Sequence, residues 1–201
     1  MKNKTIYLII ISTVVVTLVL TSLGYKAVVV TGEYPFCGSC HAWDGAIAET
    51  NVMDPVHGAS NPKGVQATCT QCHLPHDNIV NYLYTKAKNG IAEGFTTLTG
   101  DPNEKDWLAN REHARKYYTF DSSCLNCHNN AFVEANELKT STINKMHQKY
   151  IEFKDSDEAM KCTDCHKHVG HKNLGGTLFK LKSKEASSWE EWEALRAKTN
   201  N

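Results

Sequence analysis

The pattern Cys-x-x-Cys-His occurs four times in this 201-residue chain and uses all eight of its cysteines. The four copies begin at Cys37, Cys69, Cys124 and Cys162. A chain of this length and composition would contain about 0.02 copies by chance, so the repetition indicates a shared chemical purpose. Any fold must therefore bring four pairs of thiols, each followed directly by a histidine, to places where a common ligand can bind.

Covalent attachment of c-type haem requires this arrangement. Two thiols separated by two residues reach the two vinyl positions of the porphyrin, and the adjoining histidine ligates the iron on one face. We therefore expect four covalently bound haems c. The attachment residues would be Cys37, Cys40, Cys69, Cys72, Cys124, Cys127, Cys162 and Cys165, and the iron ligands beside them His41, His73, His128 and His166.

Zinc sites and disulfides are two other uses of paired cysteines. A structural zinc site does not need a histidine directly after every second cysteine. Disulfides would suit an oxidising compartment, but they leave the four adjoining histidines without a role. Both alternatives explain less of the pattern than haem attachment does.

The composition agrees with a chain that encloses large apolar groups. The formal net charge is +0, so no basic patch points to nucleic acid. The mean hydropathy is −0.45 although one long apolar run is included, and the remainder is therefore polar for its size. Four macrocycles would supply much of the missing apolar core, and we expect the apoprotein to fold poorly.

An uncharged run of 21 residues, 5–25, lies near the N-terminus. At 1.5 Å per residue it is long enough to cross a hydrocarbon layer of about 30 Å, which predicts a membrane anchor. A cleaved signal peptide is the alternative, with Ser22-Leu23-Gly24 as a weak cleavage site. Lys2 and Lys4 precede the run and predict a cytoplasmic N-terminus, so the remaining chain would lie on the periplasmic side of a bacterial inner membrane.

The motif spacing predicts the organisation of the rest of the chain. The motifs start 32, 55 and 38 positions apart, which favours two di-haem halves joined by a longer connector. The predicted fold class is mainly α: one N-terminal transmembrane helix and a small multihaem c-type cytochrome domain, with little regular β structure. The predicted domains are the anchor 1–25, the tetrahaem domain 26–180 and a C-terminal tail 181–201.

Helical spacing and end signals predict several helices. The connector shows helical periodicity over 77–95, and Asp101-Pro102-Asn103-Glu104 has the residue pattern of a helix start, with a basic helix at 110–118 to follow. A further helix is expected within 131–153, after which Gly170, Gly175 and Gly176 should interrupt the chain. The tail contains a short amphipathic pattern over 187–198.

Six histidines lie outside the motifs and are candidates for the second axial position of the irons. A haem that only transfers electrons usually has both axial positions filled by the protein. Surface exposure is the alternative for each of them. Two of the six follow a motif histidine too closely to reach the opposite face of the same haem, namely His76 and His168. The other four are His57, His113, His147 and His171.

The N-terminal anchor, the four motifs and the stretch "CTQCHLPHDNIVNYLYTKAKNG" together resemble the NapC/NirT/NrfH family of tetrahaem quinol dehydrogenases, over residues 8–175. Within that family the short chain is most similar to the small, membrane-bound subunit of cytochrome c nitrite reductase. The resemblance implies that His57 ligates the third haem and His171 the second. It also implies that His147 completes the fourth haem, which some shorter members complete with a ligand from a partner.

The first haem is where this chain departs from the family pattern. Many members carry a methionine ligand two residues after the motif histidine, and Trp43 stands there in this chain. We therefore expect His41 itself to bind the iron. The resemblance implies a carboxylate or weak contact on the other face, for which Glu93 is the candidate and Met53 the less favoured one.

The family also implies a quinol site near the first haem. Lys86 aligns with the family's quinone-site lysine, and Glu93 or Asp77 could pass the released proton outward. A lysine that snorkels from an interfacial helix is the alternative reading of Lys86.

The expected function is a membrane-bound quinol dehydrogenase that oxidises menaquinol or ubiquinol and passes electrons through four haems to a periplasmic reductase in anaerobic respiration. The first partner that we expect is a multihaem nitrite reductase, and a homo-oligomer or hetero-complex is possible. The alternative is a membrane-tethered tetrahaem electron relay without its own quinol site. A haem-based sensor is a third reading, but no output module is visible.

Overall fold

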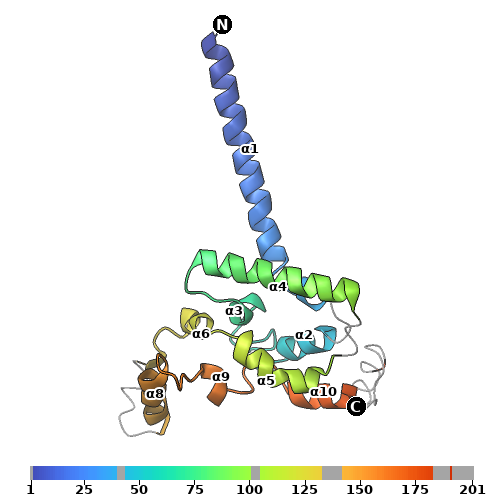
Figure 1. Ribbon diagram of the computed structural model, residues 1–201, viewed down its shortest axis with the longest axis vertical. Coiled ribbons are helices and arrows are strands. Elements are labelled where there is room, and N and C mark those ends of the chain that lie inside the picture. The colour runs from blue at the N-terminus through green and yellow to red at the C-terminus, as the bar shows by residue number, and fades with distance from the viewer. Residues whose placement is uncertain (1, 40–43, 101–104, 133–141, 183–190, 192–201) are drawn as a thin grey trace.

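A computed structural model describes residues 2–39, 44–100, 105–132, 142–182 and 191. Within these ranges the chain forms helices and no strand, which confirms the predicted mainly α fold class. The elements (Figure 1) are α1 (Lys2–Val30), the short 3-10 helix η1 (Phe36–Gly38), α2 (Asp44–Val52), α3 (Thr70–His73), α4 (Ile79–Thr99), α5 (Trp107–Tyr117), α6 (Asp121–Cys127), α8 (Thr142–Phe153), α9 (Cys162–Cys165) and α10 (Leu174–Lys182).

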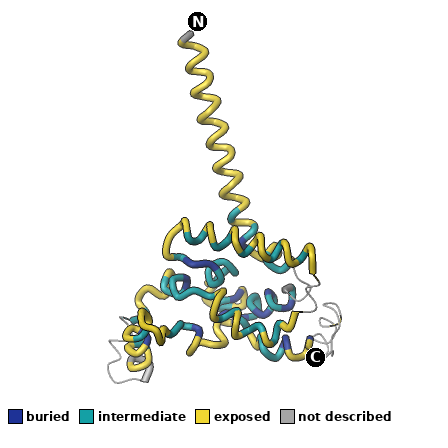
Figure 2. The backbone as a smooth tube through the Cα atoms, viewed as in Figure 1, coloured by how far each residue is buried: buried dark blue, intermediate teal, exposed yellow. Residues whose placement is uncertain are grey.

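The uncharged run 5–25 lies inside α1, which extends beyond it at both ends. The C-terminal extension forms because Ala27 and Val28 to Val30 continue the apolar helix past Lys26, and Thr31 and Gly32 follow its end. At 1.5 Å per residue the helix is about 43 Å long, more than a hydrocarbon layer of about 30 Å. All its side chains from 5 to 25 are exposed (Figure 2), so α1 is long and apolar enough to span a membrane.

The predicted connector helix is present as α4. Asn78 caps its start by accepting a hydrogen bond from the Asn81 amide, and Gly100 follows its end. The basic helix is present as α5, but its cap is Asp106, which accepts from the Ala109 amide at 3.0 Å. The start predicted at 101–104 lies outside the described residues.

Three other predictions concern the C-terminal half. Helix α8 falls within the predicted range 131–153, of which 133–141 lie outside the described residues. The tail pattern 187–198 also lies outside them, apart from a helical Glu191. The prediction that Gly175 and Gly176 interrupt the chain is wrong, because both lie within α10. The Arg111 guanidinium of α5 occupies the space that a Cβ at Gly175 would take, so this side chain lies directly against the α10 backbone.

The apolar core is small for a chain of this length. A buried cluster of Ala46, Leu178 and Leu181 joins α2 to α10, and Trp107 of α5 packs against it. Apolar side chains that are buried in the described part of the chain number six: Ala46, Ala48, Leu74, Tyr150, Leu178 and Leu181. Residues of α3, α6, α8 and α9 line a shared space next to this core.

Helix α4 lies crosswise beneath the end of α1 (Figure 1). The Lys86 ammonium of α4 donates a hydrogen bond of 2.8 Å to the Val28 carbonyl in the last turn of α1. The carbonyls of a last helical turn have no partner within the helix, so this bond satisfies one of them and fixes the anchor on the domain.

Candidate haem-binding site

A cavity of about 1140 Å³ extends through the domain between the helices. Typical small-ligand pockets measure about 300–1,000 Å³, so this space is larger than one ordinary ligand needs. Every described motif cysteine lines it: Cys37, Cys69, Cys72, Cys124, Cys127, Cys162 and Cys165. Cys40 and His41 of the first motif lie outside the described residues. The motifs of both sequence halves therefore face one shared cavity.

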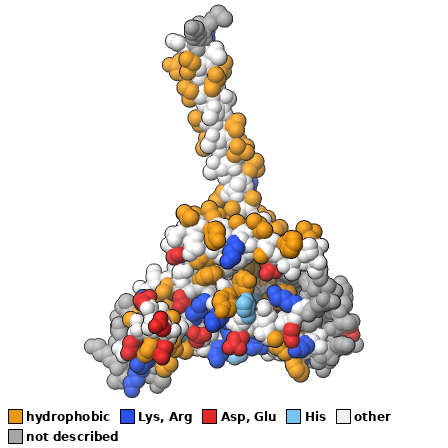
Figure 3. Space-filling view, in the orientation of Figure 1, with side chains coloured by type: hydrophobic (Ala, Val, Ile, Leu, Met, Phe, Trp, Pro, Cys, Tyr) orange, Lys and Arg blue, Asp and Glu red, His pale blue; other side chains and the backbone are white. Residues whose placement is uncertain are grey.

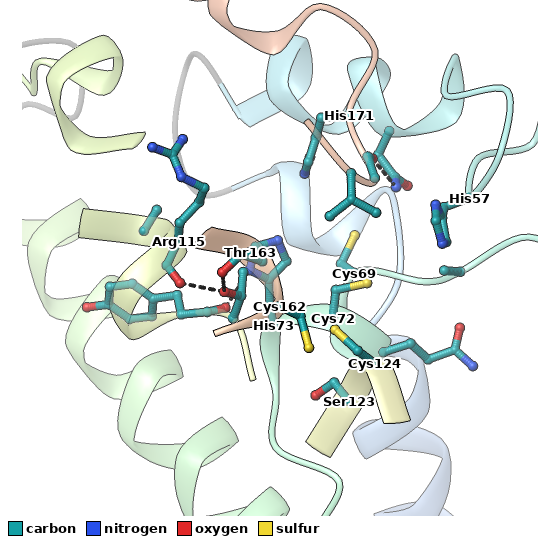
Figure 4. A pocket seen from close by; sticks show the side chains of 18 of the residues that line it. His57, Cys69, Cys72, His73, Arg115, Ser123, Cys124, Cys162, Thr163 and His171 are labelled. Carbon is teal, nitrogen blue, oxygen red and sulfur yellow. Dashed lines mark hydrogen bonds between the residues drawn. The ribbon is translucent and has the colours of Figure 1, made fainter. Parts of the chain in front are cut away.

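The histidine of the second motif faces a histidine from near the end of the domain. The ring centroids of His73 and His171 are 6.2 Å apart (Figure 4). His73 Nδ1 donates a hydrogen bond of 2.7 Å to the Tyr118 carbonyl, which can only accept. Its Nε2 is therefore unprotonated and carries a lone pair.

A buried threonine sets the tautomer of His171 in the same way. The Thr50 hydroxyl lies 2.6 Å from the Ile47 carbonyl and 2.9 Å from His171 Nδ1. Its single proton goes to the carbonyl, so the Thr50 oxygen accepts from a protonated Nδ1. The Nε2 lone pair of His171 is left available, like that of His73.

Helix α2 holds the loop around His171 from both sides. The Asn51 side-chain amide donates to the Gly170 carbonyl, and the Lys172 amide donates to the Thr50 carbonyl, each at 2.8 Å. Burial lowers the pKa of His73, and it lowers the pKa of His171 to about 4. Both imidazoles are therefore neutral near pH 7, as metal ligation requires.

A second pair joins the histidine before the second motif to the histidine of the third. The ring centroids of His57 and His128 are 6.1 Å apart. Asp54 builds the turn that presents His57, because its Oδ1 accepts from the Val56 and His57 amides at 2.9 and 2.7 Å. His57 Nδ1 is buried and finds no hydrogen-bond partner in the described part of the protein.

A third pair joins α8 to the fourth motif. The ring centroids of His147 and His166 are 6.4 Å apart. Phe132 contacts the His147 ring edge-on and stacks on Tyr150 at 5.4 Å, which fixes the face of α8 that turns inward. His147 Nδ1 is likewise buried and without a hydrogen-bond partner among the described residues.

These pairs fit the haem groups that the motifs predict. Two imidazoles that ligate one ion from opposite sides, with bonds of about 2.0 Å, have ring centres roughly 6.3 Å apart. The three observed separations, 6.2, 6.1 and 6.4 Å, agree with this geometry. Nδ1 of His147 and Nδ1 of His57, which lies 3.8 Å from Asp54 Oδ1, are buried and make no hydrogen bond among the described residues, so both rings remain available as metal ligands.

The thiols of the second, third and fourth motifs also lie close together (Figure 4). Burial, with a smaller contribution from Cys124, raises the pKa of Cys72 to about 11. A hydrogen bond between Cys124 and Cys162 lowers the pKa of Cys124 and raises that of Cys162. The attachment points of these motifs are therefore neighbours around the cavity.

The region around Cys37 lies directly beneath the anchor. Phe36, Lys86 and Glu93 line the cavity there, and the two α4 residues lie two turns apart on one helix face. Burial lowers the pKa of Lys86 below its ordinary value. Glu93, the predicted ligand, thus lines the cavity on the same helix face as Lys86, and its expected counterpart His41 is outside the described residues.

Several other predicted candidates lie away from the cavity. Asp77 is exposed at the start of α4, where hydrogen bonds from Asn81 lower the pKa of its carboxyl group. His76 Nε2 bonds the Thr70 carbonyl, and His113 packs on Tyr117 with ring centroids 4.6 Å apart. Met53 packs against the α2–α10 core instead.

His168, in contrast, lines the cavity without pairing to another described histidine.

Two functional side chains were missed by sequence reasoning. Asp54-Pro55 has a turn signature that could have marked Asp54 as the residue that orients His57. Thr50 carries no such signal, because its role depends on His171, which is distant in the sequence.

A family model for the NapC/NirT cytochrome c family, N-terminal region, matches residues 1–175. The chain belongs to the NapC/NirT cytochrome c family. Members of this family carry covalently bound haem c, so the chain is a membrane-anchored multihaem cytochrome with a role in electron transfer. Among the described residues, α1 is the one helix long and apolar enough to cross a membrane, which agrees with a single-pass protein of the inner membrane.

Curated members of the NapC/NirT family are similar over most of the chain. The cytochrome c-type protein NapC of Escherichia coli (strain K12) is 30% identical over 142 residues, 68% of this chain and 67% of that protein. The tetraheme c-type cytochrome CymA of Shewanella oneidensis is 30% identical over 174 residues, 81% of this chain and 90% of that protein. The cytochrome c-type protein TorC of Escherichia coli (strain K12) is 29% identical over 195 residues, 94% of this chain and 45% of that protein. No solved structure matched the chain.

Proposed function

We propose that this cytochrome is a quinol dehydrogenase that oxidises menaquinol or ubiquinol in the membrane and delivers the electrons to a periplasmic reductase. The observation that carries the proposal is the position of Lys86. This lysine lines the cavity beside Cys37 and contacts the last turn of α1, where a membrane-dissolved substrate would meet the domain. The proposed orientation places the N-terminus in the cytoplasm and the domain in the periplasm.

Haem c, when bound, supplies one-electron redox centres at the four motifs. The proposed ligand pairs are His73 with His171 for the second motif, His57 with His128 for the third, and His147 with His166 for the fourth. For the first motif we propose His41 with Glu93. Neutral imidazoles held in fixed tautomers support the first of these pairs, and the ring separations support all three histidine pairs.

Lys86 would act as the base of the quinol site. Oxidation of a quinol releases two electrons and two protons, so a group that accepts a proton is useful beside the electron acceptor. The lowered pKa of Lys86 makes the neutral amine more accessible. Glu93 lies on the same cavity-facing side of α4, and its carboxylate oxygen that does not bind the iron is better placed than Asp77 to receive the proton next.

Three variants test whether Lys86 acts as a base or only caps α1. Lys86→Leu removes both roles, whereas Lys86→Arg keeps a donor to the Val28 carbonyl but cannot give up its proton near neutral pH. We expect both variants to lower the rate of haem reduction by a quinol analogue roughly 100-fold, with reduction by dithionite unchanged. Lys88→Leu, on the exposed side of α4, is the matched control and should react like the wild type. A Lys86→Arg variant with the wild-type rate would show that only the cap matters.

The pH dependence of quinol oxidation provides a second test. The base must be neutral, so the rate should rise with pH as Lys86 loses its proton, with a midpoint below the ordinary lysine value of 10.5. The initial rate of reduction by a quinol analogue can be measured between about pH 6 and 9. The rise should be absent in Lys86→Leu, and an identical profile in that variant would contradict the assignment.

The electron acceptor is a separate part of the proposal. The resemblance to the small subunit of cytochrome c nitrite reductase makes a multihaem nitrite reductase our first choice of partner. Affinity purification from solubilised membranes should then recover that enzyme with this chain. The relay alternative predicts that purified protein is not reduced by any quinol analogue, whichever reductase is recovered.

A further inference from the structure

Helix α4 has two different faces. One face carries Tyr82, Lys86, Asn89 and Glu93, which are partly buried, and the last three line the cavity. The opposite face is apolar and exposed to an unusual degree. It presents Val80, Tyr84, Ile91, Phe95 and Leu98, with 74, 66, 75, 68 and 87% of each residue exposed.

These five residues, which we call the α4 stripe, follow one line along the helix. They recur at intervals of three, four and seven residues, the spacing that keeps side chains on one face. The stripe extends over almost the whole helix, roughly 27 Å at 1.5 Å per residue. Ala87 and the exposed Lys88 separate Tyr84 from Ile91 on this face. Soluble proteins rarely leave so many large apolar side chains on one helix face in water.

The α4 stripe is continuous with the surface of the anchor. Helix α4 lies crosswise at the base of α1, and apolar side chains cover the top of the domain beneath the anchor (Figure 3). The Lys86–Val28 hydrogen bond fixes the two helices together at this junction. Most of the charged side chains in the same view lie on the lower part of the domain, with one basic and a few acidic side chains at the level of α4.

We propose that α4 lies in the interfacial layer of the bilayer that α1 crosses, with the α4 stripe in contact with lipid acyl chains. A helix of this kind lies in the plane of the interface with its apolar face buried about 5–10 Å below the headgroups. The occupant is lipid rather than another protein, because α1 brings the stripe to the depth where its own apolar surface enters the membrane. The proposal rests on α1 spanning the membrane and is independent of quinol oxidation.

Lipid photo-cross-linking of the full-length holoprotein tests this placement. p-Benzoylphenylalanine is introduced at Phe95 or Leu98 of the stripe, and the protein is reconstituted in nanodiscs of phosphatidylethanolamine and phosphatidylglycerol. Controls at exposed sites on other elements are Tyr117 of α5 and Phe179 of α10, and Val19 in α1 reports the anchor itself. All these replacements lie on exposed surfaces, so each variant should bind haem normally. After irradiation, mass spectrometry of the peptides identifies the adducts.

We expect phospholipid adducts at positions 19, 95 and 98 and at least tenfold fewer at 117 and 179. An adduct at 19 without any at 95 and 98 would overturn the proposal, as would equal labelling at all five positions. Cross-links from 95 or 98 to a second copy of the chain, in place of lipid, would instead make the stripe a protein interface. None of these outcomes depends on the rate of quinol oxidation, so the two proposals fail separately.

Discussion

The Thr50 hydroxyl shows how much of the site depends on single atoms. Thr50 is 0% exposed, and its oxygen accepts from His171 Nδ1 while its proton is held by the Ile47 carbonyl. A hydrogen bond to the outer nitrogen of a ligating imidazole raises the basicity of the ligating nitrogen. Thr50 is therefore expected to tune the iron that His73 and His171 would share.

Replacing Thr50 by valine should raise the reduction potential of one of the four haems. Valine keeps the shape of threonine but cannot accept the proton, so the more basic ligand that favours the oxidised iron is lost. One hydrogen bond of about 1 kcal/mol corresponds to a rise of roughly 40 mV. Potentiometric titration monitored by electron paramagnetic resonance would resolve the affected haem. Thr50→Ser should restore the wild-type potential, and four unchanged potentials in Thr50→Val would contradict this role.

Several single residues could be predicted from the sequence because they are part of the four motifs. The cysteines and the adjoining histidines follow from the pattern alone, and His57, His147 and His171 followed from the family resemblance. Thr50 could not be predicted, since its role arises only when α2 meets a loop from the other end of the domain. Asp77 shows the opposite case: a carboxylate near Lys86 in the sequence that lies apart from the cavity.

At the level of elements, Asp121 joins three helices that carry separate parts of the site. Its Oδ2 accepts from the Tyr150 hydroxyl of α8 at 2.7 Å, and its Oδ1 accepts from the Cys162 amide of α9 at 3.0 Å. Burial, together with this carboxylate, raises the pKa of Tyr150. Asp121 itself begins α6, so one side chain fixes the third motif relative to the fourth and to His147.

Removal of this carboxylate should loosen the packing of α6, α8 and α9. Asp121→Ala would leave the Tyr150 hydroxyl without its acceptor, at a cost of about 1–3 kcal/mol in the free energy of unfolding. Tyr150→Phe removes the hydroxyl donor itself and should lower the free energy of unfolding by less than Asp121→Ala does. The double variant should lower it by less than the sum of the two single variants. Guanidinium unfolding of the holoprotein in micelles, followed by the Soret band, measures these values. If the effects of the two single variants on the free energy of unfolding simply added, the Tyr150–Asp121 hydrogen bond would not contribute to stability.

Helix α10 illustrates the limit of prediction for elements. Local rules treat neighbouring glycines as a break, yet Gly175 lies inside α10, where the Arg111 guanidinium occupies the space that a Cβ would take. Tertiary packing therefore overrides the local preference. Helix α4 was predictable from its helical periodicity, although it contains Gly90 and Gly94.

At the scale of the whole molecule, a small apolar core and a large cavity belong together. Six buried apolar residues in the described part of the chain cannot hold a domain of this size, and the helices instead surround the space that the motif cysteines line. The negative mean hydropathy of the sequence predicts this balance. The position of α4 across the anchor could not be predicted, because periodicity does not say what covers an apolar face.

Blocking haem attachment should therefore abolish the folded domain while leaving the anchor helical. In cells that cannot attach haem c, we expect limited proteolysis to degrade residues 31–182 and to leave a membrane-protected fragment that contains α1. Immunoblots with tags at either end would follow both parts. A domain that resists protease without haem would contradict the interpretation that the cofactors form much of its core.

The pairing of His73 with His171 affects when the second haem site can be completed during synthesis of the chain. His73 emerges from the ribosome early and His171 near the end, yet the two rings face one another across 6.2 Å. The haem site of the second motif therefore lacks one of its two expected ligands until the chain beyond the last motif has been synthesised. We therefore expect chains that still lack His171 to be incomplete at this site and more sensitive to protease than the finished protein.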